Sequence, residues 1–92
     1  MRRTARNLRY HELVGLEVSV KSHTDASMIS VSGLVIGETK NMLEVLSGGR
    51  VLKVPKIGGL FAFKLDDGTN VIVRGDDIVG RPEDRLKRVA GG

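Results

Sequence analysis

Few side chains in this chain have the type and spacing that chemistry requires. The two histidines, His11 and His23, do not show the spacing of a shared metal site, and the serines near His23 lack the glycine-rich turn that exposes a nucleophile. The chain contains no cysteine, which excludes a disulfide, a thiolate zinc site and a cysteine nucleophile. We therefore expect no catalytic residue and no metal bound by the protein.

Two acidic pairs are the remaining candidates for metal binding or acid–base chemistry. Paired carboxylates such as Asp66–Asp67 and Asp76–Asp77 are able to bind magnesium. However, residues 66–69 read Asp-Asp-Gly-Thr between two alternating segments, and residues 75–77 follow a predicted strand. Both contexts are typical of turns, so we interpret the pairs as turn residues. The glycine pairs at 48–49 and 58–59 lead into no phosphate loop.

The distribution of charge indicates a polyanionic partner. The 92 residues carry a net charge of +4. Residues 1–12 contribute four Arg against one Glu, residues 13–80 seven basic against eight acidic side chains, and residues 81–92 four basic against two acidic ones. Two basic ends on a near-neutral centre favour a nucleic acid, because phosphate contacts dominate nucleic-acid affinity. The alternative interpretation is that the basic ends only keep the chain soluble.

Aromatic side chains are scarce, which limits how a nucleic acid is recognised. Tyr10, Phe61 and Phe63 are the only ones, and the two phenylalanines share one face of a predicted strand. That spacing favours a place in the core. Because single-stranded nucleic acids are usually bound by stacking on exposed rings, we expect contacts to the backbone and shape of a structured RNA instead.

The elements that must position these residues are mostly strands. From residue 15 to residue 74, apolar and polar residues alternate with a period of two, and turn residues interrupt the alternation at short intervals. Gly33 inside one such segment predicts a bulge or sharp bend. The pattern indicates about six strands in a small antiparallel barrel or strongly bent sheet. The predicted strands span residues 16–21, 29–36, 42–46, 50–54, 61–66 and 71–73.

Short helices are predicted at both ends of a single domain that spans residues 1–92. Residues 4–13 have N-cap candidates and end before Gly15, while Pro82 and the acidic residues after it are typical of a helix N-terminus. We place the barrel at about 15–74 and basic terminal segments at 1–14 and 81–92. No stretch is long and apolar enough to span a membrane, and the lack of cysteine fits a reducing cytoplasm.

Three stretches together resemble a known family. They are residues 8–16 (LRYHELVGL), 37–43 (GETKNML) and 79–88 (VGRPEDRLKR), and the last is the most specific. In this order and spacing they resemble the archaeal ribonuclease P protein component 1 family, which is related to a eukaryotic RNase P/MRP subunit. The resemblance implies an Sm-like or SH3-like barrel that binds the RNA of ribonuclease P, which cleaves the 5′ leader from precursor tRNA.

The same resemblance implies that the RNA, with magnesium ions bound to it, is the catalyst. It also implies a zinc-ribbon protein subunit as partner and an indirect role toward precursor tRNA. We expect the protein itself to be cytoplasmic and monomeric when free. The apolar faces of the terminal segments, including Leu8, Leu13 and Leu86, are either core or partner surface. On matching positions and nearby basic residues, we predict RNA phosphate contacts at Arg6, Arg9, Lys40, Asn41, Lys53, Lys56, Arg81, Arg85, Lys87 and Arg88.

Two other classes of protein are alternatives. One is a different small-barrel RNA-binding protein, such as an Sm-type ring former or a ribosomal protein. The other is an SH3-type module that binds proteins, whose basic ends are incidental. Peptide grooves of the SH3 type are lined by aromatic rings, and the shortage of rings disfavours this alternative.

Overall fold

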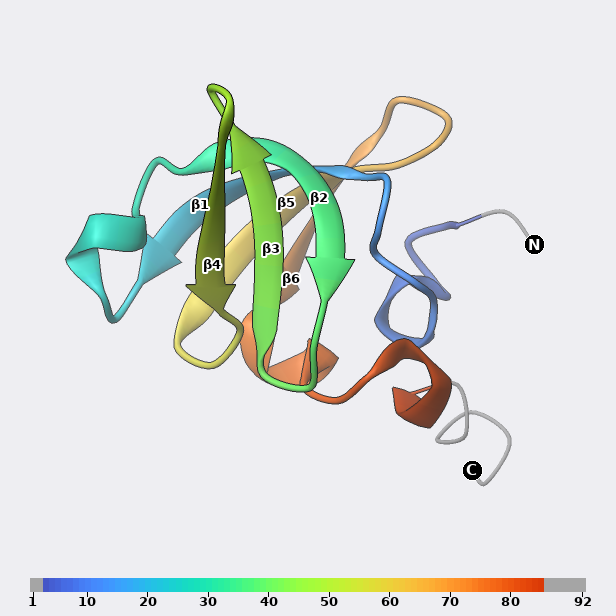
Figure 1. Ribbon diagram of the computed structural model, residues 1–92. Coiled ribbons are helices and arrows are strands. Elements are labelled where there is room, and N and C mark those ends of the chain that lie inside the picture. Colours follow the sequence, from blue (N-terminus) through green and yellow to red (C-terminus); the bar gives the residue numbers. More distant parts are fainter. Residues whose placement is uncertain (1–2, 86–92) are drawn as a thin grey trace.

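Six strands joined by short connections make up most of the chain (Figure 1). The computed structural model describes residues 3–85. The strands are β1 (Glu17–His23), β2 (Ser32–Glu38), β3 (Met42–Ser47), β4 (Arg50–Pro55), β5 (Gly59–Lys64) and β6 (Asn70–Arg74). Three short 3-10 helices are η1 (Leu8–Tyr10), η2 (Ala26–Met28) and η3 (Gly75–Ile78), and residues 82–85 are helical.

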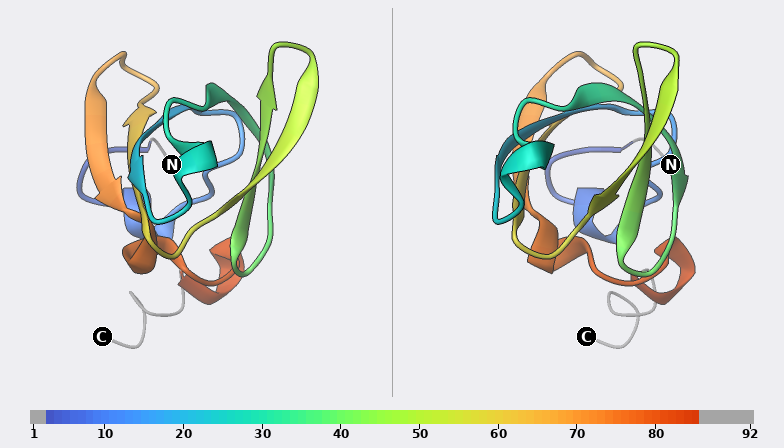
Figure 2. Two further views of the ribbon diagram at one scale, coloured as in Figure 1. Left: turned by 90° about the vertical axis from the view of Figure 1, so that its left-hand side faces the viewer. Right: turned by 60° about the vertical axis from the view of Figure 1, so that its left-hand side comes forward.

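All six strands belong to one antiparallel sheet with the order β4-β3-β2-β1-β5-β6. The sheet is strongly bent, so that β3 and β4 lie across a common interior from β5 and β6, as the left view of Figure 2 shows. This arrangement confirms the predicted mostly-β, barrel-like fold of about six strands. Because β1 pairs with both β2 and β5, the first strand lies in the middle of the sheet and joins its two halves.

Glycines at positive φ form the turns that the sequence predicts. Gly48 and Gly49 have φ angles of 56° and 81° in the β3–β4 hairpin, and Gly68 has a φ of 91° in the β5–β6 hairpin. In the second hairpin, Asp67 accepts hydrogen bonds from the backbone and the hydroxyl of Thr69 at 3.0 and 2.6 Å. The interpretation of this acidic pair as turn residues is confirmed for Asp67.

The sheet bends at two irregularities of register, and neither is at Gly33. One lies between Val20 and Ser22, and the other between Val35 and Gly37. Gly33 itself pairs regularly with Val18, so the predicted bulge is wrong in its position. The glycine is needed for another reason: a Cβ built there would lie 2.1 Å from the carbonyl oxygen of Leu46, so the neighbouring backbone leaves no space for a side chain.

Side chains from every strand form the core inside the bent sheet. The alternation of burial follows the period of two that the sequence shows, and both phenylalanines are fully buried. The N-terminal segment adds Leu8 and Leu13 to this core, and η3 adds Ile78. The buried core residues are Leu8, Leu13, Leu16, Val18, Val20, Val35, Leu43, Val45, Val54, Phe61, Phe63, Leu65, Val73 and Ile78.

The terminal segments pack beside the sheet, but with less helix than predicted. The N-terminal segment forms turns and the three-residue η1 instead of a helix over 4–13, because so short a stretch is ordered by docking of Leu8 and Leu13 rather than by its own propensity. Near the C-terminus, residues 82–85 are helical as predicted, and the rest of that predicted helix lies outside the described residues. Within residues 3–85, no helix has the length and apolar character to cross a membrane.

Candidate nucleic-acid interface

Three segments that are far apart in the sequence meet at one end of the sheet. They are η1, the turn between β2 and β3, and residues 79–85, which lie together at the lower end of Figure 1. The backbone N–H of Gly80 donates to the carbonyl oxygen of Lys40 at 2.7 Å, and Nε of Arg85 donates to the carbonyl oxygen of Arg9 at 2.7 Å. Four exposed polar side chains surround this meeting point, and we call them the basic end: Arg9, Lys40, Asn41 and Arg81.

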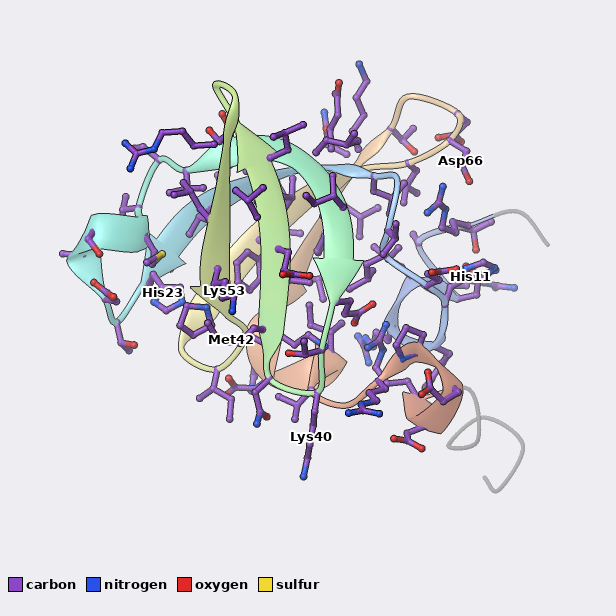
Figure 3. All side chains as sticks on the ribbon, in the orientation of Figure 1. His11, His23, Lys40, Met42, Lys53 and Asp66 are labelled. Carbon is purple, nitrogen blue, oxygen red and sulfur yellow. The ribbon has the colours of Figure 1, made fainter. Side chains whose placement is uncertain are left out.

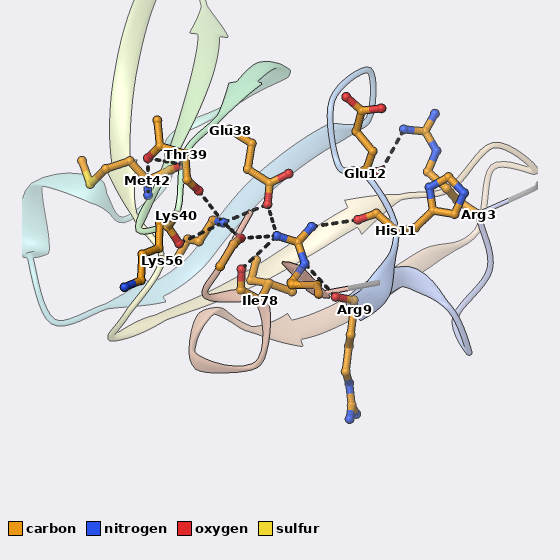
Figure 4. Close-up of polar contacts among 12 residues, drawn as sticks. Arg3, Arg9, His11, Glu12, Glu38, Thr39, Lys40, Met42, Lys56 and Ile78 are labelled. Atoms are coloured by element: carbon orange, nitrogen blue, oxygen red, sulfur yellow. Dashed lines mark hydrogen bonds and ion pairs between the residues drawn. The ribbon is translucent and has the colours of Figure 1, made fainter. Parts of the chain in front are cut away.

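A buried group of charges lies directly behind the basic end (Figure 4). Oε1 of Glu38 accepts hydrogen bonds from Nζ of Lys56, at 2.8 Å, and from Nη1 of Arg85. The side chains of both cations are fully buried, and that of Glu38 is 1% exposed. We call Glu38, Lys56 and Arg85 the buried cation cluster, because one carboxylate faces two cations and leaves a net charge of +1.

Main-chain carbonyl groups accept further hydrogen bonds from the two cations. Nζ of Lys56 donates to Thr39, Lys40 and Gly80 at 2.8, 3.3 and 2.9 Å. The guanidinium of Arg85 donates to Gly80 at 2.6 Å, and to further carbonyl groups in the N-terminal segment and in η3. Those further acceptors are Arg9 at 2.7 Å, His11 at 2.8 Å and Ile78 at 3.3 Å.

A β-bulge places Glu38 in the interior. Val35 pairs with Val45 and Gly37 with Glu44, so Ile36 is an extra residue in β2. An extra residue shifts the alternation by one position, and side chains beyond it change faces. Glu38 therefore pairs with the buried Leu43, on the inner side of the sheet, where Lys56 and Arg85 neutralise it.

Comparison with known proteins assigns the chain to a family. The family model described as ribonuclease P/MRP, subunit p29, matches residues 6–88. The chain belongs to the ribonuclease P/MRP p29 family. Among relatives, ribonuclease P protein component 1 of Staphylothermus marinus is 47% identical over 90 residues, which cover 97% of this chain and 98% of that protein. The corresponding protein of Pyrococcus horikoshii is 47% identical over 85 residues, covering 92% and 66%.

A solved structure supports the same assignment to the p29 family. The structure of Mth11, described as a homologue of human RNase P protein Rpp29, superposes with a TM-score of 0.60. The two chains are 38% identical, and the match covers 82% of this chain and 97% of Mth11. The resemblance drawn from residues 8–16, 37–43 and 79–88 is thereby confirmed. In this member of the p29 family, those three stretches include the segments that meet at the basic end.

Two of the predicted RNA contacts are wrong. Lys56 and Arg85 were expected to reach phosphate groups, but both side chains are fully buried and donate to Glu38 and to backbone carbonyls. Burying a cation is unfavourable unless it is paired and hydrogen-bonded, and these two satisfy that condition inside the protein. Sequence reasoning treated them as exposed because Lys and Arg are rarely fully buried.

The remaining predicted RNA contacts do not all lie at the basic end. Arg6 is exposed in the segment before η1, and Lys53 is exposed on the outer face of β4, opposite Glu44. Figure 3 shows Lys40 projecting from the β2–β3 turn, away from the body of the protein, and Lys53 higher on β4. Lys87 and Arg88, and the apolar Leu86, lie outside the described residues.

Two polar side chains that organise this region, Glu38 and Arg3, are not among the predicted site residues. Glu38 lies inside the motif at 37–43, yet nothing in the sequence marks the bulge that turns it inward. Arg3 forms an ion pair with Asp66 at 2.9 Å and donates to the carbonyl oxygen of Val14 at 2.6 Å, which attaches the N-terminal segment to the β5–β6 hairpin. For Arg3, the only signal was its position in a basic terminal segment.

Both histidines are partly buried, and His23 contacts the protein backbone and the ring of Phe61, whose centroid lies 6.3 Å from that of His23 in an edge-on arrangement. Nε2 of His23 lies 2.8 Å from the carbonyl oxygen of Pro55, and its Nδ1 accepts a hydrogen bond from the backbone N–H of Asp25 at 3.0 Å. Asp25 in turn accepts from the hydroxyl and backbone N–H of Ser27, and these hydrogen bonds lower the pKa of its carboxyl. Among residues 3–85, no three His, Asp or Glu side chains are grouped as metal ligands are.

Proposed function

We propose that this protein binds the RNA of ribonuclease P through the basic end and stabilises the RNA in its active form. The observation that carries this proposal is that Arg9, Lys40 and Arg81 come from three distant parts of the sequence, are each exposed, and lie on segments that meet at one end of a p29-family protein. Basic side chains gathered in this way bind phosphate groups and release counterions from the RNA. The protein contributes no catalytic group, and the RNA with its magnesium ions cleaves precursor tRNA.

The position of the aromatic residues supports recognition of backbone and shape. Phe61 and Phe63 are fully buried, where they pack on each other with ring centroids 6.2 Å apart. Neither ring is available to stack on an unpaired base, which is the usual basis of sequence-specific RNA binding. The same burial disfavours an SH3-type module, because such a groove requires exposed rings. We infer that the RNA element bound is a folded one, recognised by its phosphates.

The further assignments extend this proposal. We propose that a zinc-ribbon protein subunit is the partner of this chain in the assembly, and that the free protein is a monomer in the cytoplasm. Magnesium is bound by the RNA in this view. Precursor tRNA is then affected only indirectly, through the RNA that the protein stabilises.

Reconstitution tests the assignment of the protein to ribonuclease P. The full chain and a zinc-ribbon subunit are added to an archaeal ribonuclease P RNA at limiting magnesium, and cleavage of precursor tRNA is measured. We expect a rate increase, because neutralised phosphates reduce the magnesium needed to fold the RNA. A rate that is the same with and without the protein would contradict the assignment.

Salt dependence tests the basic end itself. We expect the triple variant Arg9→Ala, Lys40→Ala and Arg81→Ala to lower the slope of log affinity against log salt by about 2, at roughly 0.7–0.9 for each phosphate contact. The matched control replaces three exposed cations outside the basic end, Lys21, Arg50 and Lys64, with alanine and removes the same charge. Equal slopes for the two triple variants would show that net charge, rather than the basic end, binds the RNA.

A further inference from the structure

The three cations of the basic end lie on segments that have no continuous element in common. Arg9 is in η1, Lys40 is in the turn after β2, and Arg81 follows Gly80 near the C-terminus. Phosphates of a folded RNA have fixed spacings, so three cations bind them together only if these segments keep a fixed arrangement. A contact within the protein must therefore hold these three segments in place relative to one another.

The buried cation cluster makes these connections through the main chain of the basic residues themselves. Arg85 donates to the carbonyl oxygen of Arg9, and Lys56 donates to that of Lys40. Both cations donate to the carbonyl oxygen of Gly80, the residue immediately before Arg81. The carbonyl oxygens that the cluster binds therefore belong either to a residue of the basic end or to its direct neighbour in the sequence.

The contacts of the cluster are of the kind that restricts motion. They are charge-assisted hydrogen bonds in a buried site, where such bonds are stronger than on the surface. The carboxylate of Glu38 and the carbonyl of Gly80 each accept from both cations, so the bonds are shared rather than independent. The planar fork of Arg85 has donors in fixed directions toward Arg9 and His11, which a lysine lacks.

We propose that Arg85 and Lys56 are positioning residues for RNA binding, which act through the backbone of Arg9, Lys40 and Arg81 and never touch the RNA. This inference rests on the proposed function of the basic end. Arrangement of the cations before binding lowers the entropic cost of ordering three segments on the RNA. Arg85 has the larger part, because it joins the two terminal segments to the sheet.

Arg85 is also the better position for a test. Without its cation, the cluster contains one carboxylate and one ammonium, so no unpaired charge is left in the interior. In the part of the chain that the structure describes, the apolar core residues all precede residue 79 and the last strand ends at residue 74. We therefore expect the sheet to fold in variants at position 85.

Two variants and one control separate position from charge. Arg85→Lys keeps the charge but not the fork, Arg85→Met removes both, and Arg50→Met removes one exposed charge in the β3–β4 hairpin, at the opposite end of the sheet. Amide hydrogen exchange of the free proteins reports the order of residues 8–11 and 79–81 relative to the strands. Filter binding to an archaeal ribonuclease P RNA, repeated over a series of salt concentrations, reports affinity and the number of phosphate contacts.

The proposal expects a specific combination of results. Arg85→Met exchanges faster at 8–11 and 79–81 with the strands still protected, binds RNA about ten-fold more weakly, and loses about one unit of salt slope, the amount expected for one or two phosphate contacts. Arg85→Lys shows a smaller change of the same kind although its charge is unchanged. If Arg85→Met also loses protection in the strands, the test rests on Arg85→Lys alone. The proposal then requires that Arg85→Lys lower the slope of log affinity against log salt although its charge is unchanged.

Two results would overturn the proposal. One is an unchanged salt slope in Arg85→Lys together with equal losses in Arg85→Met and Arg50→Met, which would mean that Arg85 contributes only charge. The other is unchanged exchange at 8–11 in Arg85→Met. A different pair of results would show that the basic end is not the RNA site. The triple variant of Arg9, Lys40 and Arg81 would then bind RNA with an unchanged salt slope, while amide hydrogen exchange at residues 8–11 and 79–81 would still be faster in Arg85→Met.

Discussion

Individual side chains show how the environment, more than the residue type, decides what a charged group does in this protein. Lys56 and Lys40 are both lysines, and Arg85 and Arg81 are both arginines. Yet Lys56 and Arg85 are fully buried, whereas Lys40 and Arg81 are exposed. The difference arises from Glu38, a nearby carboxylate that is itself turned inward. A buried cation is stable only where a counter-charge and enough acceptors are present, and these come from elsewhere in the chain.

Glu38 is the carboxylate that pairs with both cations of the buried cation cluster, so its loss should be severe. We expect Glu38→Gln to destabilise the fold by about 3–5 kcal/mol, because it leaves two buried cations without a carboxylate. In Glu38→Gln/Lys56→Met the loss should be smaller, since only one cation is then unpaired. Urea unfolding of the two variants measures this, and a double variant less stable than Glu38→Gln would contradict the expectation.

Asp25 gives a pH-dependent prediction at the same scale. The hydroxyl of Ser27 is the main cause of its lowered pKa, followed by the backbone N–H of Ser27. Because the pKa in the folded state is lowered, these hydrogen bonds stabilise the fold above the ordinary pKa of an aspartate and are lost as the pH falls through the lowered value. We expect Ser27→Ala to raise the pKa of Asp25, as followed by carboxyl NMR signals. An unchanged titration in Ser27→Ala would show another cause.

At the scale of elements, the bent sheet depends on close approach of β2 and β3. The backbone around Gly33 lies against Leu46, and one residue of β2 is bulged nearby. Figure 2 shows the sheet bent around its core, and the bulge in β2 turns Glu38 toward the interior. The position of the buried cation cluster is therefore a consequence of strand geometry.

Gly33→Ala tests this close approach. A Cβ at this position would lie 2.1 Å from a backbone oxygen that has no freedom to move alone, so the strands must separate. We expect a destabilisation of about 1–3 kcal/mol, typical of overpacking. Ser32→Ala, one residue earlier on an exposed position of the same strand, is the control and should change stability little. Thermal unfolding of both variants decides, and equal Tm values would contradict the expectation.

At the scale of the whole molecule, the barrel-like sheet and the C-terminal segment have separable roles. Within residues 3–85, the apolar core residues end at Ile78, whereas residues 79–85 supply Arg81 to the basic end and Arg85 to the cluster. The sheet is thus the scaffold on which the two terminal segments are fixed. The near-neutral centre of the sequence contains the sheet, and the basic ends of the sequence contain the terminal segments.

A chain that ends at Pro82 tests whether the sheet folds alone. We expect residues 1–82 to unfold cooperatively, with sheet resonances close to those of the full chain, because removal of Arg85 leaves Glu38 and Lys56 as a balanced pair. The truncated chain should bind ribonuclease P RNA more weakly and with a smaller salt slope. NMR spectra and filter binding measure the two effects. Loss of a folded spectrum would mean that residues 83–92 are part of the folding unit.

The sequence by itself determined the class of fold and the family. Alternation with a period of two, glycine turns and the motifs at 8–16, 37–43 and 79–88 are local properties, and local properties are visible in a single chain. The burial of Phe61 and Phe63 also followed from their spacing on one strand face.

Only the tertiary structure decided which basic residues face the solvent. The bulge at Ile36 reverses the face on which Glu38 lies, and this change has no signature in composition or spacing. Once Glu38 is inside, it binds Lys56 and Arg85, which come from distant parts of the sequence. Burial of a charge depends on partners brought together by folding, and for that reason residue type alone misassigned these two cations and left Arg9, Lys40, Asn41 and Arg81 as the basic end.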